Sequence, residues 1–137
     1  MSVTDQELIQ LLQECKTIAV VGLSPKEDRP AYRVTAYMQS KGYRIIPVNP
    51  AFPEILGEKA YPSLEEIPAD LKVDLVDVFR RGEDTPPIAQ SAVAIKAKAI
   101  WLQSGITNEE SMAIARQAGL QAIQDKCLMV EHRRLLG

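Results

Sequence analysis

Short apolar runs alternate with helical patterns along most of this 137-residue chain, and this alternation restricts the fold more than any other feature. Strands are expected at Ile18–Val21, Arg44–Val48, Val73–Phe79, Ala99–Leu102 and Leu120–Ile123. Helices are expected at 4–14, 30–41, 85–96, 108–118 and 127–135, with a helical turn at 64–67. This order predicts a single α/β domain, residues 1–137, with a mainly parallel five-stranded sheet and helices on both faces. Right-handed crossovers make that arrangement a doubly wound, Rossmann-like fold.

Local signals mark the ends of several predicted helices. Thr4 with Glu7, and Thr107 with Glu110, have the spacing of a capping box, in which side chain and backbone satisfy each other at a helix start. Pro30 suits the first position of a helix, where the missing N–H is not needed. These signals mark the starts of the first, second and fourth predicted helices, at 4–14, 30–41 and 108–118.

Residues 17–43 contain the pattern of a phosphate-binding site. A buried strand ends at Gly22, a polar loop with Pro25, Lys26 and Arg29 follows, and Pro30 opens a helix. The start of a helix leaves backbone N–H groups unpaired, and its dipole favours an anion. The stretch therefore points to a nucleotide-like ligand at the carboxyl end of the first strand.

The loop does not carry the fingerprints of the commonest nucleotide sites. Gly22 is followed by LSPKEDRP, so the glycines of GxGxxG are missing, and GxxxxGK[ST] is absent as well. The second strand ends at Asn49, where NAD-binding proteins place an acid on the ribose diol. The absence of that acid permits a phosphorylated ribose, so NADP or coenzyme A is more natural here than NAD.

Composition limits the other classes of function. The formal charge of −2 argues against broad nucleic-acid binding, which usually needs a basic face. No apolar run is long enough to cross a membrane, and no secretory signal is evident, so we expect a cytoplasmic protein without membrane contact. Cys15, Cys127 and His132 do not have metal-ligand spacing. We therefore expect no metal site and a small-molecule ligand; any protein partner is left open.

Several blocks occur in order over residues 18–135: VVGLSPKEDRPAYRV, GYRIIPVNP, VDLVDVFRR, AIWLQSGITNEE and CLMVEHRRL. Together they closely resemble the small stand-alone CoA-binding proteins, which are related to the N-terminal CoA-binding domain of the succinyl-CoA synthetase α subunit. The resemblance implies coenzyme A or an acyl-CoA as the ligand. It does not carry over synthetase activity, because the chain lacks the second domain with the phosphorylated histidine.

The resemblance also implies roles for individual residues. The turn that approaches the pyrophosphate would be Gly22, Leu23, Ser24 and Pro25, with Lys26 and Arg29 as charge partners and Pro30 opening the helix. The adenosine half would pass Asn49 and Pro50, with Val78, Phe79 and Arg80 as the opposite wall of the adenine site. Gln103 and Ser104 would lie near the path of the pantetheine. We find no catalytic constellation and expect a sensor, carrier or accessory protein.

Two other functions remain open at this point. A small NAD(P)-dependent oxidoreductase would share the fold but needs a proton donor that we do not find. A thiol redox module would use Cys127 to exchange with the thiol of CoA. A nucleophile–base pair of Cys127 and His132 is not expected, because a spacing of five does not place them on one helix face. Asp74 and Asp77 are expected at a strand edge or bound to backbone, and not as an acid pair.

Overall fold

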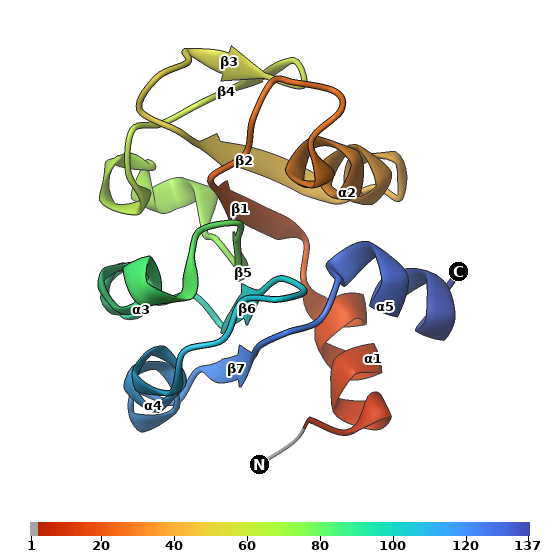
Figure 1. Cartoon of the computed structure of the whole chain (residues 1–137), viewed down its shortest axis with the longest axis vertical. Coiled ribbons are helices and arrows are strands. Elements are labelled where there is room, and N and C mark those ends of the chain that lie inside the picture. Colours follow the sequence, from red (N-terminus) through yellow and green to blue (C-terminus); the bar gives the residue numbers. More distant parts are fainter. Residues whose placement is uncertain (1–2) are drawn as a thin grey trace.

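The computed structural model describes residues 3–137 and contains the predicted alternation of strands and helices (Figure 1). The main strands are β1 (Thr17–Val21), β2 (Arg44–Val48), β5 (Leu75–Val78), β6 (Ala99–Leu102) and β7 (Gln121–Ile123). The helices are α1 (Asp5–Glu14), α2 (Pro30–Ser40), α3 (Thr85–Ala94), α4 (Glu109–Gln117) and α5 (Leu128–Leu135). Short 3-10 helices at Leu64–Glu66, Ala69–Leu71 and Gly82–Asp84 occupy the connections.

The five main strands form one parallel sheet in the order β2-β1-β5-β6-β7. From β1 the chain crosses to β2 on one side and then returns past β1 to β5 on the other. The order therefore reverses between β1 and β5, whose last residues Val21 and Val78 are register partners. The predicted doubly wound, Rossmann-like fold is confirmed, and its ligand crevice is expected at the carboxyl ends of these two strands.

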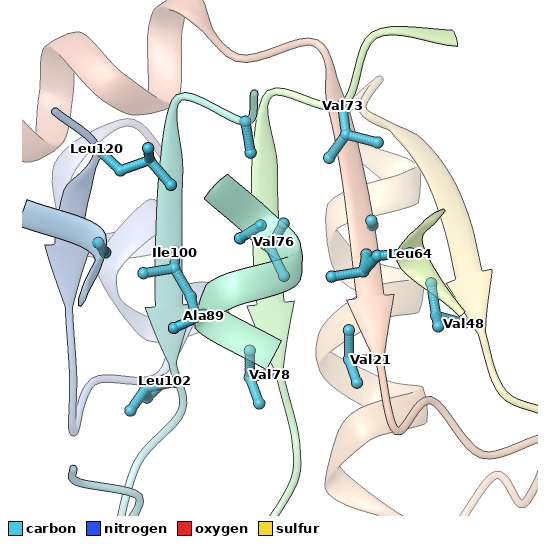
Figure 2. Packing of buried hydrophobic residues seen from close by; sticks show 14 of the residues in the cluster. Val21, Val48, Leu64, Val73, Val76, Val78, Ala89, Ile100, Leu102 and Leu120 are labelled. Carbon is cyan, nitrogen blue, oxygen red and sulfur yellow. The ribbon is translucent and has the colours of Figure 1, made fainter. Parts of the chain in front are cut away.

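Both faces of the sheet are covered, so its strands are buried throughout most of their length. Figure 1 shows α3 and α4 on one side and α1, α2 and α5 on the other. Figure 2 shows the core beneath α3, where Val21, Val76, Val78, Ile100 and Leu102 project from neighbouring strands. The opposite core includes the fully buried side chains Ile18, Leu75 and Trp101. Because parallel strands covered on both faces bury both sets of side chains, they read as continuous apolar runs in the sequence.

Some boundaries differ from the sequence predictions. The capping box of Thr4 and Glu7 is present, but α4 is capped by Asn108, not Thr107: the Asn108 side chain accepts from the Ser111 N–H at 2.8 Å. β5 begins at Leu75 and not at Val73, because the Asp74 carboxylate turns back to accept from the N–H groups of Lys16 and Thr17. That contact confirms the predicted backbone binding by Asp74.

A small antiparallel hairpin, β3 (Glu54–Ile55) with β4 (Glu58–Lys59), was not predicted. Its turn residues Leu56 and Gly57 both have positive φ, at 56° and 75°. A turn with two left-handed residues usually carries Asn-Gly or Asp-Gly, and leucine at the first position hides that signal. The hairpin lies beyond β2 (Figure 1).

Candidate functional site

A cleft of about 920 Å³ opens at the carboxyl ends of β1, β5 and β6, where the strand order reverses. Nine of the residues predicted for ligand binding line it: Gly22, Ser24, Lys26, Arg29, Pro30, Phe79, Arg80, Gln103 and Ser104. These residues come from three separate segments of the chain, 22–30, 79–80 and 103–104, so the fold brings the predicted loop, helix start and strand ends to one surface.

Gly22 allows the backbones of the two central strands to approach each other at the floor of this cleft. Its φ is +88°, and a Cβ at this position would lie 2.6 Å from the carbonyl oxygen of Phe79. Its N–H donates to the Val48 carbonyl at 3.2 Å. Glycine is required here both for the left-handed backbone and for the missing side chain.

The start of α2 faces the cleft without a protein cap. Arg29 is the N-cap residue and its side chain makes no capping hydrogen bond, and Pro30 occupies the first helical position. Pro30 has no N–H, and the N–H groups of Tyr32 and Arg33 donate to the Arg29 carbonyl at 3.1 and 3.2 Å. The attraction for an anion at this end therefore comes mainly from the helix dipole.

Basic side chains accumulate around this helix start. Lys26, Arg29 and Arg80 are exposed, line the cleft, and form no ion pair within residues 3–137. Arg81 also lines the cleft but is paired with Glu83 and Asp84, at 3.7 and 3.2 Å. Three cations without acidic partners next to an uncapped helix form a surface suited to phosphate groups.

Five predicted site residues lie outside the lining of the cleft. Leu23 and Val78 are fully buried in the two cores, and Pro25 and Pro50 lie on the loops beside the cleft. Asn49 joins these loops: its Nδ2 donates to the Leu23 carbonyl at 2.9 Å, and its Oδ1 accepts from the Ala51 N–H at 2.8 Å. In this structure the Asn49 side chain therefore holds the glycine loop in position.

A second, smaller cavity of about 270 Å³ lies between the ends of β1 and β2 and the start of α3. Its apolar lining includes Val21, Val48 and Ile88, with Pro62 and Pro87 nearby on its wall. Arg80 lines both this cavity and the large cleft, so the two spaces are neighbours on either side of this residue.

A buried polar bridge lies beneath the cleft. Gln103 Nε2 donates to Asp77 Oδ1 at 2.5 Å, and Gln103 Oε1 accepts from the Leu128 N–H at 3.3 Å. Burial raises the pKa of Asp77 to about 7, although the hydrogen bond from Gln103 opposes the rise. Asp77 does not lie at an edge of the sheet, because β5 is the central strand, but it does bind backbone, as the other expectation has it: the Val78 N–H also donates to its carboxylate.

Cys127 and His132, the remaining two residues considered for chemistry, lie in different parts of the structure. Cys127 is half-buried and lines the cleft just before α5. His132 is 7% exposed, with Nδ1 at 3.0 Å from the Tyr37 hydroxyl and its ring edge-on to Tyr37 and Tyr43. Burial lowers the pKa of His132. His132 thus joins α5 to α2, and it has no place in the lining of the cleft.

A further cavity of about 640 Å³ lies at the opposite end of the sheet, lined by Leu64, Val73, Ile95 and the lysines 72, 96 and 98. Ligands of open α/β sheets bind at the carboxyl ends of the strands, so the large cleft is the better candidate. Among residues 3–137, no group of three or more His, Cys, Asp or Glu side chains is placed to hold a metal ion. No helix in the described part of the chain is long and apolar enough to span a membrane.

Comparison with known proteins assigns the family. Residues 16–133 match the model of the CoA binding domain. The chain belongs to this family of CoA-binding domains. It is 44% identical over 126 residues to the protein YneT of Bacillus subtilis, covering 92% of each chain. A solved structure from Pyrococcus horikoshii superposes with a TM-score of 0.94 at 40% identity, covering 98% of this chain and 94% of the other.

The family also extends to a domain of larger enzymes. An ADP-forming acetate–CoA ligase of Archaeoglobus fulgidus is 27% identical over 123 residues, which is 82% of this chain but 18% of the ligase. The resemblance to CoA-binding proteins inferred from the sequence blocks is therefore confirmed at the level of the family.

Sequence reasoning missed several residues of the cleft. Phe52, Arg81 and Ile106 line it, although none of them was predicted as a ligand contact, and Cys127 lines it, although it was considered only for the thiol-exchange alternative. Phe52 lies two residues after the predicted Asn49-Pro50 strand end, and Arg81 follows Arg80, so extending each predicted segment by one or two residues would have included them. Cys127 lies far away in sequence, and only the return of the chain after β7 brings it to this wall.

Proposed function

We propose that this protein binds coenzyme A or an acyl-CoA in the large cleft, with the pyrophosphate at the Gly22 loop and the start of α2. The observation that carries the proposal is the meeting of three unpaired basic side chains, Lys26, Arg29 and Arg80, with an uncapped helix start. In a member of the CoA-binding domain family, an anionic group at this position is the expected occupant. The cleft of about 920 Å³ is large enough for an extended ligand.

The two halves of the ligand would then lie on either side of the pyrophosphate. The adenine fits the smaller apolar cavity between Val48 and Ile88, which neighbours the cleft at Arg80. The pantetheine would follow the strand end at Gln103 and Ser104 towards Cys127. In this arrangement Arg80 would stand between the adenine and the phosphates, where a guanidinium can donate to either a phosphate or a ring nitrogen.

The proposed role is binding without catalysis, as a sensor, carrier or accessory protein. No base, nucleophile and orienting group are brought together in the cleft by the described residues. The ligase activity of the larger relative is not proposed for this chain, which spans only 18% of that enzyme.

Replacing Arg29 by Ala tests the phosphate site directly. We expect CoA affinity to fall by about 1–3 kcal/mol, because a charge-assisted contact is lost without any loss of packing. Arg33→Ala is the matched control, since Arg33 is exposed on the same helix but does not line the cleft. Calorimetric titration with CoA measures both. Equal affinities of the Arg29 variant and the wild type would contradict the assignment of the phosphates to this loop.

A second candidate function is favoured by the position of Cys127 on the cleft wall. In a thiol redox module, the Cys127 thiolate would attack the disulfide of an oxidised CoA, forming a Cys127–CoA mixed disulfide and releasing the other half as a thiol. Incubation with CoA disulfide, followed by mass measurement of the intact protein, tests this step. Cys127→Ser should abolish the adduct and Cys15→Ser should retain it, since Cys15 is 2% exposed. An adduct on the Cys127→Ser variant would exclude the proposed exchange.

A further inference from the structure

The central strand carries a carboxyl group that the proposed binding does not use. Asp77 lies in β5 and is 1% exposed. Its register partners on the neighbouring strands are Val20 and Trp101. Alternation along the strand places its side chain on the same face as Leu75, which packs in the core beneath α1, α2 and α5. The carboxyl group is therefore held in an apolar layer at the ligand end of the sheet.

One side chain separates this carboxyl group from the cleft. Gln103 lines the cleft and donates to Asp77 Oδ1, while the Leu128 N–H donates to Gln103 Oε1. The backbone donor at Leu128 fixes the orientation of the amide, because only the oxygen of the amide can accept. The amide nitrogen must then face Asp77. A change in the charge of Asp77 therefore changes the electrostatic potential at Gln103, which lines the cleft.

No cation compensates Asp77 within residues 3–137. The covering faces of α1 and α2 contribute the apolar side chains Leu8, Leu12, Val34 and Met38 together with Thr35. The titratable or charged groups on α5 are Glu131 with its partner Arg134, His132 with its partner Tyr37, and Arg133, which lies over the Tyr37 ring. Those around the cleft are Cys127, Glu83, Lys26, Arg29, Arg80 and Arg81. The free cations among these line the cleft, where a bound phosphate would neutralise them.

Burial without a cation disfavours the charged form of a carboxyl group. A phosphate bound at the Gly22 loop, in the cleft that Gln103 also lines, would disfavour it further, both by direct repulsion and by neutralising the basic side chains of the cleft. We propose that binding of an anionic ligand in the cleft is coupled to uptake of a proton by Asp77. For the identity of the ligand, this inference rests on the proposed function. It implies regulation by pH: the contribution of Asp77 makes the affinity for the ligand decline as pH rises through neutrality.

Proton uptake is measured by titrating the protein with CoA at pH 7 in two buffers of different ionisation enthalpy. If the ligand raises the proton affinity of Asp77 about tenfold, the wild type takes up about 0.4 proton more than Asp77→Asn. Its affinity relative to that of Asp77→Asn falls about fivefold from pH 6 to pH 8. Subtracting the variant removes the titration of the ligand's own 3′-phosphate. Asp70→Asn, the same change at an exposed aspartate outside the cleft, should retain the uptake.

Dephospho-CoA provides a test that does not depend on the folding of Asp77→Asn. It retains the pyrophosphate but has no phosphate monoester that titrates near neutral pH, so uptake by the wild type must come from the protein. Binding of CoA without a difference in proton uptake between wild type and Asp77→Asn, or without uptake from dephospho-CoA, would overturn this inference and leave the proposed function standing. Failure of CoA to bind to the wild type would overturn both.

Discussion

Gly22→Ala is expected to destabilise the folded protein strongly, although it adds only one methyl group. The added methyl group would lie 2.6 Å from the Phe79 carbonyl oxygen and 3.2 Å from Arg80 Cδ. The first of these atoms is backbone at the end of β5 and cannot rotate away. To make room, the ends of β1 and β5 must separate, which strains the hydrogen bond from the Phe79 N–H to the Val21 carbonyl, 2.9 Å long in the folded protein.

Two separate costs contribute to the expected destabilisation. A φ of +88° costs an L-residue about 1–2 kcal/mol. Forcing apart a closely packed contact adds about 1–3 kcal/mol. Gly119 has the same φ of +88°, but a Cβ there would meet nothing within 4 Å. Gly119→Ala should therefore show the backbone cost alone, and the difference between the two variants measures the close approach at Gly22.

Urea denaturation of the wild type and both variants measures these free energies of unfolding. We expect Gly22→Ala to be less stable than Gly119→Ala by about 1–3 kcal/mol and to bind CoA more weakly, because the loop that would hold the pyrophosphate moves. Gly119 lies at the end of α4, outside the cleft, so its variant should keep the wild-type affinity for CoA. Equal destabilisation of the two variants would refute the close approach of β1 and β5 at this position.

Two further predictions concern buried groups. The folded state raises the pKa of Asp77 from 3.8 to about 7, so it binds an extra proton between these values, and its contribution to stability falls by up to about 4 kcal/mol as pH rises from about 4 to about 7. Denaturation across this range should show Asp77→Asn gaining stability relative to the wild type as pH rises, and a constant difference would contradict the burial of a carboxyl group without a cation. Burial also raises the pKa of the Cys15 thiol to about 12, so an alkylating reagent should label Cys127 in the native protein and Cys15 only after unfolding. Rapid native labelling of Cys15, located by peptide mass mapping, would contradict its burial.

The elements that could be predicted are those with strong local signals. The apolar runs of β1, β2, β5 and β6 stand out because strands covered on both faces need no polar alternation. Pro30 fixed the start of α2, and Gly22 marked the loop in front of it. The family blocks then connected these local features to a ligand class that periodicity alone does not reveal.

The parts that could not be predicted depend on contacts between distant segments or on unusual local choices. The hairpin of β3 and β4 was missed because Leu56 occupies a left-handed turn position that glycine or asparagine usually fills. Thr107 and Asn108 are neighbouring capping residues, and the sequence does not indicate which of them the helix uses. The bridge from Asp77 through Gln103 to Leu128 joins residues 26 and 25 positions apart, so only the folded chain brings it together.

Calorimetric titration of the purified protein with CoA, acetyl-CoA, NAD and NADP at one fixed salt concentration tests the central claim most directly. The account predicts micromolar or tighter binding of CoA or acetyl-CoA and no response to NAD, with the CoA affinity weakened by Arg29→Ala but not by Arg33→Ala. Binding of NADP without CoA, or CoA binding that is indifferent to both arginines, would contradict the assignment of the cleft at the ends of β1 and β5 as a CoA site.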